Sequence, residues 1–293
     1  MVSQQSSSTD DGSMDDETVS LLTHLQCEPP TLHINQHFCP PGDNTKSQNY
    51  KYSDITTIRD WDGFALPEIK SNFQSLLMQA EIVPRLPSTT PREINSELEL
   101  AYIFAETVHP LVRRGLLCGF EDLGADELLE EEGRTPVILG SSGDLHTPRE
   151  KGYPDLMFWS ENENRLERHG RLPGDIKLSH KWNMDMRYSN RHLQNEFRQV
   201  LSQVNFYMVQ TVARYGFVLT DRELVVIRRS TDKDGNSIKG SLDLAKPIPW
   251  NSGLPAYDPT SGNQRARRVR FTVPLALWYL GMMASNDEDW GLW

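Results

Sequence analysis

The stretch that decides the fold is YPDLMFWSENENRLERHGRLPGDIKLS, residues 153–179. It begins and ends with short apolar runs, 153–159 and 174–179, whose length and composition predict β-strands. An acidic residue lies in each run, Asp155 in the first and Asp175 in the second. Because acidic side chains are rarely buried unless they are paired, their presence in predicted core strands indicates a functional constraint.

The segments on either side alternate between strand and helix patterns. Another apolar run precedes this stretch, and a long segment with apolar residues on one helical face follows it. We therefore expect an α/β protein with a mixed central sheet flanked by helices. The predicted elements are a helix over 90–115, strands over 135–140, 153–159 and 174–179, a helix over 190–216, strands over 215–221 and 223–229, and a helix over 272–284.

The first predicted helix carries a candidate functional acid. Thr90 is its predicted N-cap and Glu93 completes a capping box, whereas Gly115 is a predicted stop. Glu97 falls within the apolar stripe of this helix. We interpret it either as a glutamate at the edge of the buried face or as a carboxylate held against a functional site. The predicted stripe consists of Ile94, Leu98, Ala101, Ala105, Val108 and Val112.

Composition divides the chain into two parts. Residues 1–60 are acidic and rich in polar residues, and we expect them to be mostly disordered. Residues 61–293 are expected to form a single domain with a core at about 90–230. Within this domain, residues 64–82 predict an amphipathic helix and residues 231–270 are expected to be rich in loops.

Charge is distributed unevenly along the chain. The net charge is −11, and the first 60 residues carry nine acidic against three basic residues. Between residues 165 and 229, twelve Lys and Arg outnumber six Asp and Glu. Because phosphate contacts require basic side chains, the overall charge is unfavourable for a nucleic-acid substrate, but the local excess in the middle of the chain permits one.

Nothing in the sequence predicts secretion or a membrane span. The first residues lack the basic and apolar regions of a signal peptide, and no apolar run approaches ~18 residues. Cys27, Cys39 and Cys118 have no metal-ligand spacing, and their odd number argues against a secreted disulfide framework. We expect an intracellular protein, nuclear or cytoplasmic, that is neither secreted nor attached to a membrane.

The acidic residues predict a metal site. Glu97 comes from a helix, and Asp155 and Asp175 come from adjacent strands. Converging carboxylates repel one another unless a cation lies between them, and oxygen ligands select a hard ion, here Mg²⁺ or Mn²⁺. Asp175 and Lys177 project from the same face of a strand, while Ile176 points into the packed side and can offer its carbonyl. Alternatively, the aspartates are ordinary strand-end residues and Lys177 is a solvated lysine.

These residues resemble the signature of the PD-(D/E)XK nuclease superfamily. Pro154–Asp155 is similar to the first half of that motif and Asp175–Lys177 to the second. Gln203 and Tyr207, one helical turn apart, resemble the Gln-x-x-x-Tyr motif of the RecB-type exonuclease branch. The resemblance covers roughly residues 90–230. It implies a restriction-endonuclease-like αβββαβ core, to which uncharacterised fungal members add an N-terminal region and C-terminal helical segments.

By this resemblance the protein would be a Mg²⁺-dependent deoxyribonuclease that hydrolyses phosphodiester bonds of DNA. Asp155, Asp175 and the Ile176 carbonyl would hold Mg²⁺ or Mn²⁺, and Glu97 would bind the ion directly or through water. Lys177 would orient or deprotonate the attacking water. The metal would stabilise charge that develops on the phosphate.

The resemblance also implies a nucleic-acid interface around the metal site. Gln203 and Tyr207 would reach the metal site or the DNA backbone. Four basic residues near the motif are candidates for a phosphate track, although a solvated helix face explains them equally well. These residues are Lys181, Arg187, Arg191 and Arg198.

Two other functions remain open from the sequence. The acidic balance and the long additional segments favour a catalytically silent protein with the nuclease fold, acting as a binding or accessory module in a fungal, for instance biosynthetic, pathway. A metal-dependent phosphodiesterase acting on RNA or nucleotides is the other. Retention of a charged cluster favours the enzyme, because a scaffold has no physical need for charges that are costly to desolvate.

Overall fold

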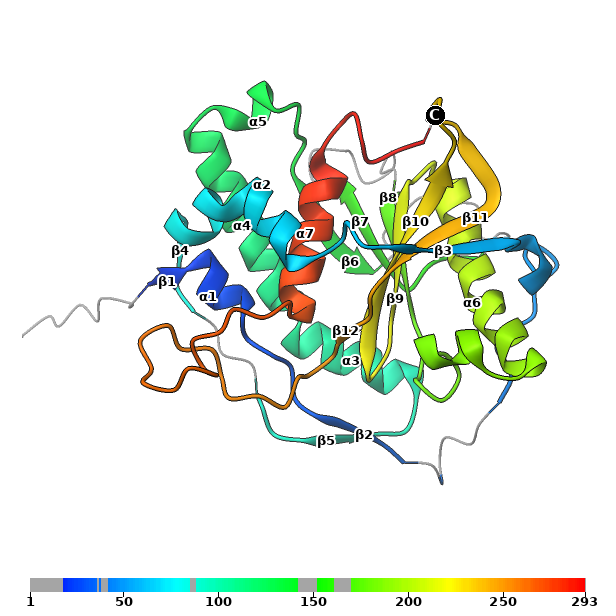
Figure 1. Ribbon diagram of the computed structural model, residues 1–293. Helices are drawn as coiled ribbons and strands as arrows, with labels where there is room; N and C mark the ends of the chain where they lie inside the picture. Colours follow the sequence, from blue (N-terminus) through cyan, green and yellow to red (C-terminus); the bar gives the residue numbers. More distant parts are fainter. Residues whose placement is uncertain are drawn as a thin grey trace, which may run out of the picture.

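The computed structural model of the protein describes residues 18–35, 37, 42–84, 88–141, 152–160 and 170–292. At its centre lies a mixed eight-stranded sheet with helices on both faces (Figure 1), so the expected α/β class is confirmed. The strands follow the order β3-β11-β10-β9-β8-β7-β6, and β12 pairs with β10. Their bounds are β3 Thr57–Trp61, β6 Val137–Ser141, β7 Leu156–Ser160, β8 Gly170–Ile176, β9 Tyr215–Leu219, β10 Glu223–Thr231, β11 Ser237–Ala245 and β12 Ile248–Pro249.

Helices cover the sheet from both sides. Helix α6 and the short 3₁₀ helix η4 pack on one face, and α1, α2, α3, α4 and α7 contribute to the core on the other. None of the described helices is long and apolar enough to cross a membrane. The bounds are α1 Leu21–Leu25, η1 Tyr52–Asp54, α2 Leu66–Gln79, α3 Glu97–Thr107, α4 His109–Ala125, α5 Leu128–Glu131, η4 Met184–Tyr188, α6 Arg191–Gln210 and α7 Val273–Ser285.

Strand β9 shows how one sheet serves two cores. Phe217 and Leu219 belong to the core that contains α4 and α7, whereas Val218 between them belongs to the core beneath α6. This alternation follows from the two-residue period of a strand. Figure 1 shows α6 on the opposite side of the sheet from α4 and α7. A strand in this position is apolar on both faces, which explains the continuous apolar runs in the sequence.

The strands that carry the sequence motif lie in the middle of this arrangement. β6, β7 and β8 form an antiparallel series, and β8 runs parallel to β9. Helix α6 supplies the crossover between the two parallel strands, as such a connection requires. It begins at its N-cap Asn190, whose side chain accepts a hydrogen bond from the Leu193 amide at 3.1 Å. The predicted strands at 135–140, 153–159 and 174–179 and the helix at 190–216 are thus confirmed, with shifted ends.

The predicted helix at 90–115 is partly wrong. Ser96 rather than Thr90 is the N-cap of α3, because its hydroxyl accepts a hydrogen bond from the Glu99 amide at 3.1 Å. The helical path bends between α3 and α4 near Pro110, which lacks the amide hydrogen that a continuous helix needs. α4 then continues past Gly115 to its end. The buried residues of α3 are Leu100, Ile103, Phe104 and Thr107, a different stripe from the predicted one.

Several short elements were not predicted. β3 and β11 pair in parallel at one edge of the sheet, and β11 lies in the segment expected to consist mainly of loops. Two small sheets join β1 (Val19–Ser20) to β4 (Glu81–Ile82) and β2 (Leu32–Ile34) to β5 (Arg92–Ile94). These strands have two or three residues each, which is too short for a periodic pattern.

A buried carboxylate fastens the edge strands. Asp243 of β11 accepts hydrogen bonds from Arg59 of β3 at 2.9 Å, from Arg228 at 2.9 and 3.2 Å, and from Ser230 at 2.7 Å. Burial alone would raise the pKa of the Asp243 carboxyl. The hydrogen bonds from Ser230, Arg228 and Arg59 outweigh burial and hold that pKa below its ordinary value.

We predict that Asp243→Asn lowers the free energy of unfolding by about 1–3 kcal/mol at pH 7, because it leaves two guanidinium groups without their anion. A carboxyl whose pKa is lower in the folded protein stabilises it above the unfolded pKa of ~3.9, and the contribution is lost as the pH falls further. The difference between variant and parent should therefore hold from pH 7 to about pH 4 and shrink below it.

Urea denaturation at a series of pH values measures this difference. Asp62→Asn is the matched control, because Asp62 forms an ion pair with Lys246 at 3.2 Å in which both side chains are largely exposed. Such a pair contributes about 0–1 kcal/mol. Equal destabilisation by the two substitutions at pH 7 would refute the role given to Asp243.

Candidate functional site

The two aspartates of the motif lie beside each other at the junction of β7 and β8. Leu156 at the start of β7 pairs with Gly174 of β8, which brings Asp155 next to the end of β8. The Asp155 carboxylate accepts a hydrogen bond from the Ile176 amide at 2.8 Å. Asp155 is exposed, whereas Asp175 is only 1% exposed. The sequence-based expectation that these two residues converge agrees with this geometry.

Gly174, which has no side chain, allows Asp175 to take its position. Gly174 lies opposite Phe217 of the neighbouring strand β9, and a Cβ atom at position 174 would overlap the Phe217 ring. The glycine therefore allows β8 and β9 to remain in register at the point where Asp175 faces α6.

Lys177 forms a buried ion pair with Asp175. The Lys177 Nζ lies 2.5 Å from the Asp175 Oδ2, and Lys177 is 7% exposed. The two side chains share a face because they are two residues apart along an extended segment. The Lys177 amide donates to the Leu219 carbonyl at 2.9 Å, which continues the pairing with β9. Ile176 between them is part of the apolar core, as expected, and its carbonyl accepts a hydrogen bond from Lys177 Nζ at 3.2 Å.

The pKa values of Asp175 and Lys177 are both shifted because the pair is buried and its members lie close to other charges. Burial raises the pKa of the Asp175 carboxyl to about 7; the Lys177 ammonium opposes this shift and the Asp155 carboxylate adds to it. Burial by itself would lower the pKa of Lys177, but the neighbouring Asp175, Glu97 and Asp155 carboxylates raise it above its ordinary value. Lys177 is therefore a cation at neutral pH.

Helix α6 contributes two further polar groups. The Gln203 side-chain amide donates to the Tyr207 hydroxyl at 3.0 Å and lies 3.4 Å from the Asp175 Oδ1. Both residues are buried. Burial, and after it the nearby Asp175 carboxylate, raises the pKa of the Tyr207 phenol. The structure thus brings together Asp155, Asp175, Lys177, Gln203 and Tyr207, all of which were predicted as site residues.

Glu97 occupies the rim of this cluster. It is the first residue of α3, and its carboxylate pairs with Lys181 at 3.2 Å. Among the described residues, Glu97, Asp155 and Asp175 do not form a group in which one ligand oxygen of each lies within 4.8 Å of the other two. Glu97 therefore acts on Lys177 through its charge and does not share the inner position of the two aspartates.

Of the four predicted phosphate-binding residues, two form ion pairs within the protein and the other two lie on α6. Lys181 pairs with Glu97, and Arg187 pairs with Asp60 of β3 at 2.5 Å and donates to the Ile58 carbonyl at 3.1 Å. Arg187 is thus already engaged in holding the edge strand. The remaining two are on α6, where Arg191 is exposed and Arg198 is half-buried.

A cavity of about 760 Å³ adjoins the carboxylates. Asp155 and Ile176 line it together with aromatic residues such as Tyr102. A second cavity of about 650 Å³ shares His109, Arg113 and Ile138 with the first. The two cavities together extend from Asp155 along α4 and the edge strand β6.

Three further residues lie around the site, and sequence reasoning missed two of them, Tyr50 and Asp221. Tyr50 is buried against Phe206 with ring centroids 5.7 Å apart, and burial, followed by the Asp175 carboxylate, raises the pKa of its phenol. Asp221 accepts hydrogen bonds from the Ser179 amide and hydroxyl at 2.6 and 2.8 Å, which fixes the segment after β8. Both ring nitrogens of His180 are buried without a hydrogen-bond partner among the described residues. No periodic or motif signal distinguished Tyr50 or Asp221 in the sequence, whereas His180 stands directly after the motif.

The Asp155 and Asp175 carboxylates fit a divalent cation. The Asp175 carboxylate is buried, and the Lys177 ammonium contacts its Oδ2 as an ion pair at 2.5 Å. Two adjacent carboxylates are the donors that Mg²⁺ or Mn²⁺ prefers. No protein-family model, curated protein or solved structure matches the chain.

We predict that Lys177→Met lowers the free energy of unfolding by about 3–5 kcal/mol at about pH 9, because this pH is above the Asp175 pKa of about 7 and the carboxyl is left buried without its cation. Adding Asp175→Asn should restore at least about 1 kcal/mol, since the uncompensated charge is then removed. Urea denaturation of the two single variants and the double variant completes the cycle. Lys181→Met is the matched control and should cost less than about 1 kcal/mol, as its pair with Glu97 is partly exposed. Additive effects at 175 and 177 would contradict the buried pair.

Proposed function

We propose that the protein is a metal-dependent nuclease of the PD-(D/E)XK type that hydrolyses phosphodiester bonds of DNA. The observation that carries this proposal is the buried pair of Asp175 and Lys177 on β8, with the Asp155 carboxylate beside it. A charged pair inside a sheet core is costly to desolvate. A chemical role for these residues explains why the chain tolerates that cost.

The order of elements supports a restriction-endonuclease-like core. Helices α3 and α4 precede the antiparallel strands β6, β7 and β8, and α6 then leads to β9, which runs parallel to β8. This is the αβββαβ order expected from the resemblance. Gln203 and Tyr207 face the aspartates from α6, as expected for a RecB-type motif.

Each polar group has a role in this proposal. Asp155, Asp175 and the Ile176 carbonyl would hold Mg²⁺, which supplies positive charge to the phosphate oxygens when bound. Lys177 would leave the Ile176 carbonyl and, as an ammonium, donate hydrogen bonds that orient the attacking water or stabilise the charge on the phosphate. Gln203 holds the Asp175 carboxylate in place through its side-chain amide. The cavities along α4 and β6 would take the nucleotides on one side of the scissile bond.

One observation favours a catalytically silent protein instead. Lys177 already neutralises Asp175 at 2.5 Å, and Arg187, a predicted phosphate contact, is engaged with Asp60. A self-compensated cluster is stable without a metal. A catalytically silent protein would bind its partner through the same fold without cutting DNA, and a DNA-cleavage assay therefore separates the two functions.

We predict Mg²⁺- or Mn²⁺-dependent cleavage of linear or circular DNA that EDTA abolishes. Asp155→Asn should lower the rate at least about 100-fold, because it removes a charged ligand from a solvent-exposed position. Asp126→Asn is the matched control, since Asp126 is an exposed acid outside the site, and it should cleave like the parent. RNA in parallel reactions tests the nucleic-acid class. Activity that persists in Asp155→Asn, or no activity in the folded parent protein, would contradict the proposal.

A second prediction concerns α6. Gln203→Leu removes the amide next to Asp175 and should lower kcat about 10–100-fold, with little change in KM for DNA, because the amide orients a ligand and does not bind substrate. Gln210→Leu on the exposed part of the same helix is the control. Equal kcat values for the two variants, each with an unchanged melting temperature, would remove Gln203 from the site.

A further inference from the structure

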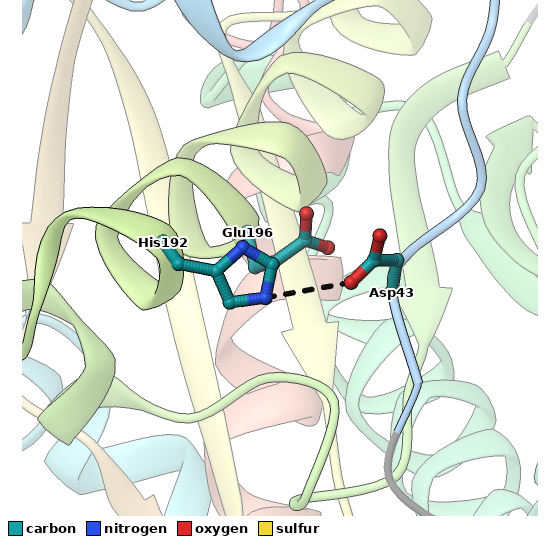
Figure 2. A group of neighbouring side chains, drawn as sticks. All are labelled: Asp43, His192 and Glu196. Atoms are coloured by element: carbon teal, nitrogen blue, oxygen red, sulfur yellow. Dashed lines mark ion pairs between the residues drawn. The ribbon is translucent and has the colours of Figure 1, made fainter.

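A second cluster of ligand-type side chains lies on the other end of α6. His192 and Glu196 are four residues apart and therefore adjacent on the helix surface, and Asp43 approaches them from the N-terminal segment. One ligand atom from each residue lies within 4.8 Å of the other two. Figure 2 shows the His192 imidazole close to the Glu196 and Asp43 carboxylates, and its Nε2 pairs with the Asp43 Oδ1 at 3.4 Å.

The carboxylate of Glu196 lacks a counter-ion. Glu196 is only 9% exposed, and its Oε2 accepts hydrogen bonds from the Asn44 amide at 2.6 Å and the Asn44 side chain at 3.1 Å. No Lys or Arg side chain forms an ion pair with it among the described residues. Buried carboxylates are costly unless a cation compensates them, so the protein atoms alone leave this group incomplete.

Asn44 provides a second unsatisfied group next to Glu196. The residue is 5% exposed, and its Oδ1 has no hydrogen-bond partner within the part of the chain that the structure describes. Its side-chain nitrogen donates to Glu196 and, at 3.0 Å, to the Lys181 carbonyl. Buried polar atoms without partners are few in folded proteins and point to an unseen water or ion.

We propose that Asp43, His192 and Glu196 bind a divalent transition-metal ion, with Zn²⁺ the best match. One imidazole nitrogen and two carboxylate oxygens are a donor set that Zn²⁺ accepts, and a water molecule completes four-coordination. The ion supplies the positive charge that Glu196 lacks. Asn44 supports the site from behind, because its two hydrogen bonds orient the Glu196 carboxylate.

The ion would fasten the N-terminal segment to α6. Residues 42–54 already bind this helix through Gln199, whose side chain donates to the Thr45 carbonyl at 3.0 Å and accepts from the Tyr52 amide at 2.9 Å. The same segment carries Tyr50, which is buried close to the Asp175 pair. Zn²⁺ would thus hold residues 42–54 in place beside the candidate active site. The three ligands are distinct from the proposed catalytic residues, so this site stands or falls independently of nuclease activity.

Isothermal titration calorimetry with ZnCl₂ tests the site. Untagged protein carrying Asp155→Asn serves as the parent, because this substitution weakens metal binding at the proposed catalytic position. The parent should bind one Zn²⁺ per chain, and adding His192→Ala or Asp43→Asn should lower the affinity at least about tenfold. His33→Ala, at an exposed histidine of β2, is the matched control and should bind like the parent. Unchanged affinity in both ligand variants, or no binding by the parent, would overturn the proposal.

Limited proteolysis tests the consequence for the N-terminal segment. The Lys46 side chain is 79% exposed, so trypsin can cleave after it when the segment detaches from α6. Zn²⁺ should slow this cleavage in the parent, and the protection should be lost in His192→Ala. Because the His192 side chain is exposed, its removal should not unfold the protein, so the lost protection would reflect lost metal binding. Equal protection of the two proteins would show that the ion does not fasten the segment.

Discussion

The buried ion pair between Asp175 and Lys177 constrains the centre of the structure. Two charges in a sheet core are stable only where partners satisfy them, and the surrounding elements meet that requirement. Gln203 of α6 reaches the Asp175 carboxylate, and Gly174 lets β9 approach closely enough for Lys177 to pair with the Leu219 backbone. α6, β8 and β9 therefore have to pack in one register. Stability and the proposed function therefore depend on the same residues.

Much of the central fold is predictable because its strands are buried on both faces. Continuous apolar runs such as 153–159, and the apolar stripe of the long helix, are strong local signals. The start of α3 was not predictable in the same way. Thr90 offers a plausible cap, but residues Arg92–Ile94 pair with the distant strand β2 and move the cap to Ser96. A long-range pairing overrides the local preference at that point.

The residues of the site were likewise predictable where local sequence decides their position and unpredictable where a partner distant in sequence does. Asp155, Asp175 and Lys177 were predictable from acids and a lysine in strand-like runs, whereas Gln203 was predicted from its resemblance to the Gln-x-x-x-Tyr motif. Arg187 was assigned to a phosphate track, yet its partner Asp60 comes from an edge strand that has no clear pattern in the sequence. The same holds for the cluster on α6: the spacing of its two helical residues is visible, but Asp43 belongs to a segment expected to be disordered. Partners distant in sequence decide both cases.

We propose that the Asp155 and Asp175 carboxylates hold a divalent cation, and a Mn²⁺ titration followed by electron paramagnetic resonance measures this binding directly. The His192→Ala variant is used so that the cluster on α6 does not contribute. We expect one bound Mn²⁺ per chain in this variant and a loss of that binding when Asp155→Asn is added. Undiminished Mn²⁺ binding after that addition, or no binding in the His192→Ala variant, would contradict it.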